Sequence, residues 1–441
     1  MSEPVVRKDV DGKMPAGGSS RQREEVEREC AKAVKEFRRV FGRPELGAYA
    51  PGRVNLMGGS IDYSGGPVIP VALQLVTVIV GRRSPNGDCR VVTLARTNQI
   101  SDEDADHTFP VPTHPSKESH SVDIGGPQWA KYLKGVVALM NKNGDVPGFE
   151  AVIVSSVPLG GGLSSSAALE VATYKFLEQL CPQTGRPDLK QAALLCQEAE
   201  HRYANVPCGL MDQFVSMMAK ESHALYIDCS TQEVEHLPLT DPNLALLIIN
   251  SEYRHDLSET STEGDRDYSS RRRTCENISS TLGIKWLRDL NQTGLEASRD
   301  QLSEVAYKRA THAVSEIDRS IRSRTILKQG KYREFGQLMT LSHYSLRDNY
   351  EVTVEELDEI VELTLRGHEG QTVYGSHLSG GGFGGCIVTL LHRDAVETVK
   401  TTISENYRSR HGKKATFVVC YPSDGAGVID SNSILLRTPE N

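Results

Sequence analysis

Apolar and polar residues alternate along this chain with two different periods, which predict helices and strands respectively. Between residues 20 and 41, apolar residues recur at helical spacing among charged ones, and Gly42 and Pro44 follow. This pattern predicts an amphipathic helix that ends at the glycine and proline. Apolar, β-branched runs then predict short strands in residues 47–57, 67–81 and 89–96.

The rest of the chain continues to mix the two periods. Residues 100–126 are polar and predict a long loop, after which residues 129–140 return to helical spacing. The remaining expected strands lie in residues 149–157, 224–229, 244–249, 377–390 and 415–421. The remaining expected helices lie in residues 167–180, 189–203, 211–219 and most of 302–367. Strands and helices in both halves predict an α+β fold with a cleft between two domains.

The domain boundaries follow from composition and from the order of these elements. Residues 1–20 are polar and contain Gly, Pro and Ser, so they predict a flexible N-terminal tail. We expect an N-terminal domain over residues 21–215 and a C-terminal domain over residues 216–441. A chain of 441 residues is long enough for two domains of ordinary size.

Composition excludes several classes of function. The net charge of −8 argues against a general nucleic-acid or anionic-membrane binder, since both need a basic surface. No apolar run is long enough to span a bilayer, and the N-terminus lacks the apolar core of a signal peptide. The nine cysteines are scattered without CxxC spacing, which indicates reduced thiols in the cytoplasm.

The segment PLGGGLSSSAALEVA, residues 158–172, carries the strongest chemical signal. Its three glycines let backbone N–H groups converge on an anion, and the helix that follows offers its positive N-terminal end. Its three serines can donate to phosphate or coordinate magnesium. The sequence lacks the Gly-Lys-Ser/Thr of a Walker A loop. A capped flexible turn is the alternative, but the preceding strand and following Ala-rich helix favour a phosphate site.

Two further segments stand out. HLSGGGFGGCIVTL, residues 377–390, places five glycines around one Phe before a strand. A single tight turn rarely needs so many, so we expect close approach to a ligand or to the first glycine turn. APGRVNLMGGSIDYSGG, residues 50–66, contains an Arg and an Asp that alone would indicate only a surface pair.

Taken together, the three segments resemble the signature motifs of the GHMP kinase family, with residues 50–66 as the first motif, and the chain is most similar to animal galactokinases within it. Shorter stretches such as CQEAEHRYANVPCGLMDQF and SLRDNYEVTVEELD support the resemblance. It implies the two-domain GHMP kinase fold, with the active site in the cleft between the domains. It also implies ATP-dependent phosphorylation of the C1 hydroxyl of galactose. The expected partner is a small sugar, with neither nucleic acid nor membrane, and the expected state is a monomer, with a weak homodimer as the alternative.

The resemblance carries specific roles onto this sequence. Asp212 matches the catalytic aspartate beside the sugar hydroxyl, and Arg53 matches the arginine paired with it. Such a carboxylate can accept a proton as attack begins, while a guanidinium stabilises developing negative charge. Ser166 and Glu200 match the magnesium-binding pair, although Glu200 alone would read as a solvated helix residue. Arg254 matches a basic residue near the reacting centre.

The resemblance also assigns the binding of both substrates. The expected ATP contacts are Gly160, Gly161, Gly162, Leu163, Ser164, Ser165, Ser166, Trp129 and Tyr132. For Trp129 and Tyr132, which match positions near the adenine, core packing is the competing interpretation. The expected sugar contacts are Asp62, Gly209 and Tyr268, together with Gly59 and Ser60.

The chain departs from the galactokinase pattern in its first motif. Galactokinases carry Gly-Glu-His-Thr-Asp-Tyr where this chain has Gly-Gly-Ser-Ile-Asp-Tyr, so Gly59 and Ser60 replace a glutamate and a histidine. Losing a hydrogen bond to a charged group costs about 1.5–3 kcal/mol. The alternatives are therefore a kinase for another sugar, or a galactokinase-like ligand sensor with little catalysis. The connection from Arg254 to Tyr268 is also longer than in close relatives, which puts the Tyr268 contact in question.

Overall fold

The fold is described by a computed structural model that covers residues 18–95, 100–112, 122–142, 144–181, 188–254, 268–366, 372–409 and 412–430. Its helices are α1 (Gly18–Val40), α2 (Gln128–Met140), α3 (Ser165–Leu180), α4 (Leu189–Ala199), α5 (Met211–Met218), α6 (Tyr268–Thr281), α7 (Gln292–Ala297), α8 (Glu304–Lys328), α9 (Tyr332–Ser345), α10 (Glu355–Leu365) and α11 (Val396–Asn406). Its strands are β1 (Leu46–Asn55), β2 (Pro67–Val68), β3 (Pro70–Arg83), β4 (Cys89–Thr93), β5 (Asp106–Phe109), β6 (Phe149–Ser155), β7 (His223–Asp228), β8 (Glu233–Pro238), β9 (Leu244–Arg254), β10 (Val373–Ser379), β11 (Gly384–His392), β12 (Thr416–Cys420) and β13 (Gly427–Val428).

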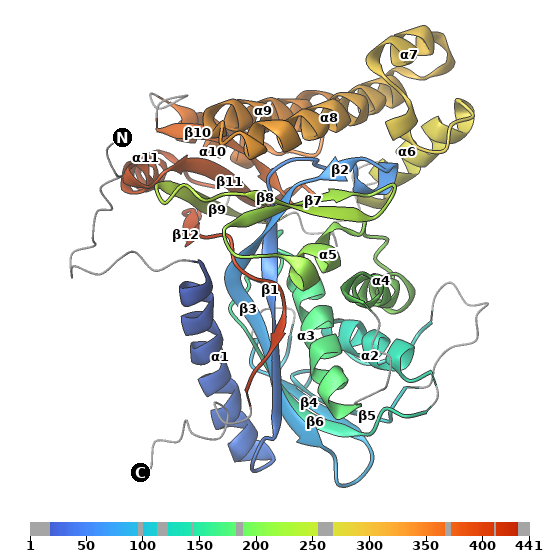
Figure 1. Cartoon of the computed structure of the whole chain (residues 1–441), viewed down its shortest axis with the longest axis vertical. Coiled ribbons are helices and arrows are strands. Elements are labelled where there is room, and N and C mark those ends of the chain that lie inside the picture. Colours follow the sequence, from blue (N-terminus) through green and yellow to red (C-terminus); the bar gives the residue numbers. More distant parts are fainter. Residues whose placement is uncertain are drawn as a thin grey trace.

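A six-stranded sheet in the order β13-β1-β3-β6-β4-β5 forms the lower half of the molecule in Figure 1. Helix α1 covers one face of this sheet, and α3 lies on the other with α2, α4 and α5 around it (Figure 1). Side chains of β3 alternate between the faces: Val76, Val78 and Val80 pack with α1, whereas Ile79 packs in the cluster that contains α3 residues. This alternation follows from the two-residue period of a strand.

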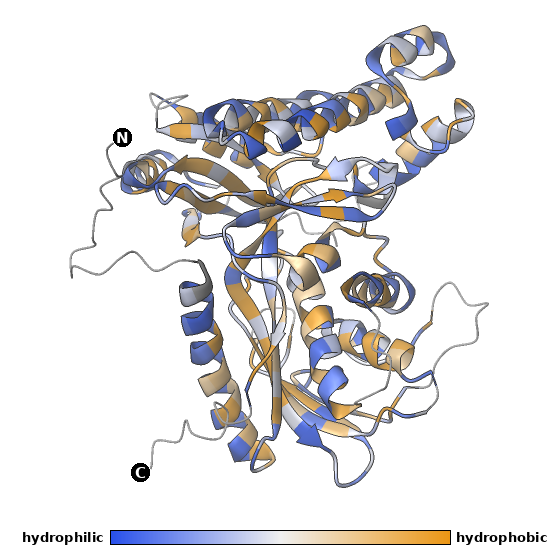
Figure 2. Cartoon of the chain, viewed as in Figure 1, coloured by the Kyte–Doolittle hydropathy of each residue, from blue (hydrophilic) through white to orange (hydrophobic). Residues whose placement is uncertain are grey.

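The upper half of the molecule is built on the antiparallel sheet β10-β11-β9-β12. Helices α9 and α10 pack on this sheet, and the long helix α8 packs on α9 (Figure 1). A small sheet, β2-β7-β8, lies between the two halves. Figure 2 shows hydrophobic residues gathered on the strands and on the helix faces that turn toward them. The predicted α+β fold is confirmed.

The chain passes between the halves more than once. Strand β13, close to the C-terminus, pairs with β1 in the first sheet, with Ala48 opposite Val428. The expected boundary between residues 215 and 216 falls inside α5. This boundary, and the tail expected over residues 1–20, remain predictions; residues 1–17 lie outside the described part.

Most of the predicted elements are present, but the long loop expected over residues 100–126 is partly wrong. Strand β5 forms there and pairs with β4, with Cys89 opposite Phe109. Its residues are mostly polar because β5 is the exposed edge strand of the sheet, so little apolar periodicity marks it. Within the described ranges, no helix combines the length and apolar character needed to cross a bilayer.

Candidate active site

The two residues expected to be catalytic form an ion pair between β1 and α5. Arg53 donates from Nε to Asp212 Oδ1 and from Nη2 to Asp212 Oδ2, both at 2.7 Å. A third nitrogen, Nη1, donates to the backbone oxygen of Gly162 at 2.6 Å. Arg53 is buried, whereas the Asp212 side chain retains 20% exposure. The guanidinium is therefore fixed, and the carboxylate remains accessible to a ligand.

The glycine- and serine-rich turn reaches the same carboxylate. Ser164, the residue before α3, donates its hydroxyl to Asp212 Oδ2. Its backbone is left-handed, with φ 57°, and its side chain does not cap the helix. A non-glycine residue rarely adopts this conformation unless its surroundings impose it. The turn thus supplies a third donor to Asp212 in addition to the two from Arg53.

The second glycine-rich turn packs directly on the first. A Cβ added at Gly162, where φ is +73°, would lie 2.7 Å from the backbone oxygen of Ser379. A Cβ added at Gly380 would lie 2.9 Å from the Gly162 Cα. The expected close approach of the two turns is confirmed, and it explains why side chains are excluded from both.

A group of buried carboxylates lies behind the pair. Glu200 is 4% exposed and Glu170 is fully buried. The side-chain amide of Gln213 donates to both, at 2.6 Å to Glu200 Oε2 and 2.9 Å to Glu170 Oε2. Burial and then the charge of Asp212 raise the pKa of Glu200 to about 7. Burial and then Glu200 raise the pKa of Glu170 well above its usual value.

Glu170 and Gln213 were not identified from the sequence, because a Glu in an Ala-rich helix and a Gln next to Asp212 carry no distinct pattern.

Ser166 is close enough to hydrogen-bond Glu200, so the expected magnesium pair is brought together. Among the described residues, however, His, Cys, Asp and Glu side chains form no group of three or more arranged to hold a metal ion.

A pocket of about 180 Å³ opens beside Asp212 and runs between the two halves. It is lined by Arg53, Asn55, Gly59, Ser60, Asp62, Glu200, Val206, Cys208, Gly209, Met211, Asp212, Leu378, Gly380 and Gly381. This volume is below the range of pockets for drug-sized ligands, which suits a molecule as small as a monosaccharide. The structure therefore joins both catalytic candidates, Glu200 and four of the five expected sugar-binding residues in one cavity.

Asp62 and Gly209 lie in contact on one wall of the pocket. A Cβ added at Gly209 would come 1.7 Å from Asp62 Oδ2, so only glycine leaves room for the carboxylate. Asp62 accepts a hydrogen bond from the backbone N–H of Tyr63 at 3.1 Å. Burial, followed by the nearby charge of Asp212, raises the pKa of Asp62 to about 6. A ligand hydroxyl would give this carboxylate a donor.

Trp129 and Tyr132, expected near the adenine, are not among the described residues that line this pocket. Trp129 donates its indole N–H to the backbone oxygen of Asp104 at 3.0 Å and packs partly on the main core. Tyr132 is close enough to Glu200 for that charge to raise its pKa, after the larger effect of burial. The side chains of Arg254 and Tyr268 lie outside the described part of the structure.

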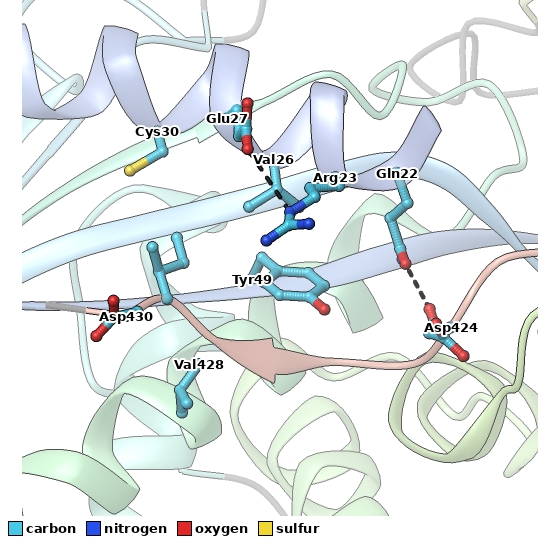
Figure 3. A pocket seen from close by; sticks show the side chains of 10 residues that line it. Gln22, Arg23, Val26, Glu27, Cys30, Tyr49, Asp424, Val428 and Asp430 are labelled. Atoms are coloured by element: carbon cyan, nitrogen blue, oxygen red, sulfur yellow. Dashed lines mark hydrogen bonds and ion pairs between the residues drawn. The ribbon is translucent and has the colours of Figure 1, made fainter. Parts of the chain in front are cut away.

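A larger cavity, of about 360 Å³, lies away from these residues, between α1, β1 and β13 (Figure 3). Gln22, Arg23 and Glu27 of α1 face Tyr49 of β1 and Asp424 across it (Figure 3). Arg23 pairs with Glu27 at 3.7 Å, and Gln22 donates to the Asp424 backbone oxygen at 2.7 Å. Of the expected catalytic and binding residues whose side chains the structure describes, none lines this cavity.

Comparison with known proteins identifies the family. Residues 35–83 match the galactokinase galactose-binding signature, residues 131–220 the GHMP kinases N terminal domain and residues 323–409 the GHMP kinases C terminal domain. The chain is 47% identical to galactokinase of Homo sapiens and 48% identical to galactokinase of Bos taurus. Each alignment spans 400 residues, which is 90% of this chain and 96% of the relative.

Solved structures agree with this assignment. The crystal structure of Lactococcus lactis galactokinase complexed with galactose matches with a TM-score of 0.78 at 27% identity, covering 89% of this chain and 98% of that one. A mevalonate kinase structure, at 16% identity and a TM-score of 0.55, shares the fold; the match covers 85% of this chain and 98% of that one. The chain belongs to the galactokinase family of the GHMP kinases.

Proposed function

We propose that this protein transfers the γ-phosphoryl group of ATP to the C1 hydroxyl of galactose, giving galactose 1-phosphate and ADP. The observation that carries the proposal is the position of Asp212. Its carboxylate lies at the meeting point of the small pocket and the glycine turn, held by Arg53 and Ser164. A sugar in the pocket and a triphosphate over the turn would meet beside this group.

The chemistry assigned to the pair follows from its hydrogen bonds. The C1 oxygen forms a bond to the γ-phosphorus while the bond from that phosphorus to the ADP oxygen breaks. If Asp212 acts as the base, it takes the proton of the C1 hydroxyl; if it only guides the attack by its charge, the proton leaves on the transferred phosphoryl group. Arg53 is held by Gly162 and Asp212, so its positive charge is already in place for the transferring phosphoryl group.

ATP and Mg²⁺ fit the residues at the other end of the pocket. Gly160, Gly162 and the start of α3 offer backbone N–H groups to phosphate. Ser166 and Glu200 would hold Mg²⁺ together with phosphate oxygens, and the buried carboxyl of Glu200, whose pKa is raised, gains stability from a nearby cation. When bound, the ion neutralises phosphate charge in the transfer. The adenine contacts of Trp129 and Tyr132 remain part of the proposal.

At the sugar end, Asp62 and Gly209 would contact the substrate hydroxyls, and Gly59 and Ser60 would leave extra room beside them. The relatives are named galactokinase, and the Lactococcus lactis protein was solved with galactose. The shortened side chains at 59 and 60 favour one second candidate, a kinase for a different sugar that uses the same pocket. Contacts from Arg254 and Tyr268 remain predictions.

A sugar panel separates the two candidates. Purified protein with magnesium and ATP is given galactose, its 6-deoxy analogue, L-arabinose or N-acetylgalactosamine, and ADP release is measured. The proposal predicts the highest kcat/KM for galactose. Higher turnover of another sugar would favour the second candidate. Protection of the protein by ATP and sugar, without ADP formation, would indicate the sensor instead.

The state of the protein in solution is also a proposal. We expect a monomer, or a weak homodimer, in the cytoplasm. All nine cysteines are free thiols in the structure, which is compatible with a reducing compartment.

A further inference from the structure

Helix α8 reaches across from the upper half of the molecule to the loop that lines the sugar end of the pocket. Glu316 is fully buried, and its Oε1 accepts the backbone N–H of Gly58 at 2.8 Å and that of Gly59 at 3.0 Å. His312, one helical turn earlier and also fully buried, lies with Nε2 3.0 Å from the Gly59 backbone oxygen. Two side chains of one helix therefore bind both backbone groups of Gly59, its N–H and its C=O.

The protonation state of His312 fixes the direction of its hydrogen bonds. Burial lowers the pKa of His312 to about 4, so the imidazole is neutral near pH 7 and carries one N–H. A carbonyl oxygen can only accept, so the N–H is on Nε2 and points at Gly59. Nδ1 then accepts from the hydroxyl of Ser345 on α9, at 3.0 Å. Both ring nitrogens are satisfied in this single arrangement.

The hydrogen bonds and the ionisation state of Glu316 are equally well defined. Arg319 donates from Nε to Oε2 at 2.8 Å, and the hydroxyl of Ser342 on α9 donates to Oε1 at 2.7 Å. Burial is the largest single effect on the pKa of Glu316 and raises it, but the smaller lowering effects, led by the charge of Arg319, together bring it to about 2. The group is an ionised acceptor, and hydrogen bonds to charged groups are stronger than those between neutral groups.

Backbone hydrogen bonds hold the loop on either side of the two glycines, from Ile69 N–H to the Met57 oxygen at 2.9 Å and from Gly66 N–H to the Ile61 oxygen at 3.0 Å. Gly58 has φ +90°, and a Cβ there would lie 2.6 Å from the Pro67 backbone oxygen. Two successive glycines have more conformational freedom than any other residue pair, and fixing them costs correspondingly more free energy. Ser60 follows with a left-handed backbone, φ 58°, and then Asp62, both of which line the pocket.

We propose that His312 and Glu316, which we call the α8 clamp, are positioning residues for the sugar pocket. They hold the backbone of residues 58 and 59 in the conformation that places Ser60 and Asp62 against the substrate. The identity of the ligand rests on the proposed function, whereas the hold on the loop does not. The clamp acts on the backbone, so it works whatever side chain stands at position 59.

The test compares Glu316→Ala and His312→Ala with a control, Glu356→Ala. Glu356, on α10, is another buried carboxylate, 3% exposed, and does not line the pocket. In steady-state kinetics, Glu316→Ala should raise KM for galactose roughly tenfold to a hundredfold, the equivalent of one lost hydrogen bond to a charged group. His312→Ala loses a hydrogen bond between neutral groups, so it should raise that KM by a smaller factor, roughly twofold to tenfold. KM for ATP should stay unchanged in all three variants.

Conservative variants supply a rescue. His312→Gln keeps an N–H donor and Glu316→Gln keeps an oxygen acceptor, so each should recover part of the galactose affinity that its alanine variant loses. If Glu316→Ala does not fold, the values of KM for galactose in His312→Ala and His312→Gln are compared with the Glu356→Ala control instead. Equal rises in KM for galactose and ATP, or the same rise in the Glu356→Ala control, would show a general structural effect and overturn the proposal.

Hydrogen exchange tests the clamp without any substrate. The amides of Gly58 and Gly59 should exchange faster in Glu316→Ala than in wild type, while Glu356→Ala should match wild type there. A wild-type protein that releases no ADP with galactose would contradict the proposed function. The exchange result would still show whether the clamp holds the backbone of residues 58 and 59. Unchanged exchange of these two amides in a folded Glu316→Ala protein would refute the proposed clamp.

Discussion

The two ends of the active-site pocket are held in place by different means. At the phosphate end, two glycine turns touch backbone to backbone, with no space for a Cβ at Gly162 beside Ser379. At the sugar end, the loop is held from behind by side chains of α8, and a Cβ at Gly59 would meet only the end of the Leu346 side chain, 3.1 Å away. The contact between the two turns therefore leaves no room for a side chain at Gly162 or Gly380, while position 59 at the sugar end can change its side chain and keep its backbone.

This difference explains where the chain departs from its family pattern. The phosphate-side turn matches the family motif in full, whereas Gly59 and Ser60 are unusual for a galactokinase. A loop positioned through its backbone can lose two side chains without losing its shape. The following variants test this contrast, in order of decreasing expected effect.

Asp212 stands between the two ends, so its loss should have the largest consequence. Asp212→Ala should lower kcat by roughly 10²–10⁴-fold, the usual contribution of a positioned proton acceptor. Arg53 then loses its partner, so the variant's melting temperature should be recorded as a control. A folded Asp212→Ala protein with near-normal kcat would remove this residue from the reaction.

A matched pair of glycines tests the phosphate end. Gly162→Ala introduces a Cβ 2.7 Å from the Ser379 oxygen at a φ of +73°, whereas the nearest atom to a Cβ at Gly161 is 3.4 Å away. Displacing a turn by about 1 Å can cost on the order of 10² in rate, so kcat/KM for ATP should fall by about that factor in Gly162→Ala. Gly161→Ala should remain close to wild type. Equal losses in both would mean that the tight contact is not what matters.

Asp62 tests the sugar end through pH. Its pKa rises from 3.8 to about 6 on folding, so the stability gained from its neutral form is present at low pH and lost as the pH rises through 6. Asp62→Asn stays neutral and should be more stable than wild type near pH 7.5 by about 1–2 kcal/mol, less than the full shift implies because the side chain lines a pocket.

Thermal melting of wild type and Asp62→Asn at about pH 7.5 and about pH 4.5 provides the measurement. The difference in stability between wild type and Asp62→Asn should be smaller at the lower pH. Galactose binding should be weaker in the variant than in wild type at both pH values. A constant gap would mean that Asp62 ionises normally in the folded protein.

The smallest effect is expected from restoring the family residues. Gly59→Glu with Ser60→His should raise kcat/KM for galactose by up to roughly tenfold, the value of one recovered hydrogen bond to a charged group. Position 59 has an ordinary φ, and histidine is among the residues that tolerate the left-handed backbone of position 60. No change, measured alongside the sugar panel, would mean that the sugar lies elsewhere in the pocket.

Much of this architecture could be predicted from the sequence, because apolar residues that recur at helix or strand spacing over many positions mark buried elements. Strands such as β6 and helices such as α3 were expected close to their observed bounds. Edge strands β5 and β13 were missed, since polar or two-residue strands carry almost no periodicity. The motifs indicated Arg53 and Asp212 through the family resemblance, and their 2.7 Å contact is a product of the tertiary fold.

The residues that support the site were beyond prediction for a physical reason. His312 and Glu316 lie about 250 positions from the loop that they hold. On an amphipathic helix, a buried His and Glu look like ordinary polar residues until the packing of α8 is known. Glu170 and Gln213 are similar, since their importance depends on a shared contact with Glu200.

The most direct test of the account is the product formed by the wild-type protein. Phosphorus NMR of a reaction with galactose, ATP and magnesium should show a sugar phosphate ester on C1 growing in step with ADP. The Asp212→Ala protein, folded to the same extent, should give neither signal. A phosphate on another carbon, or ADP formed without any sugar ester, would contradict the claim that Asp212 directs the C1 hydroxyl at the triphosphate.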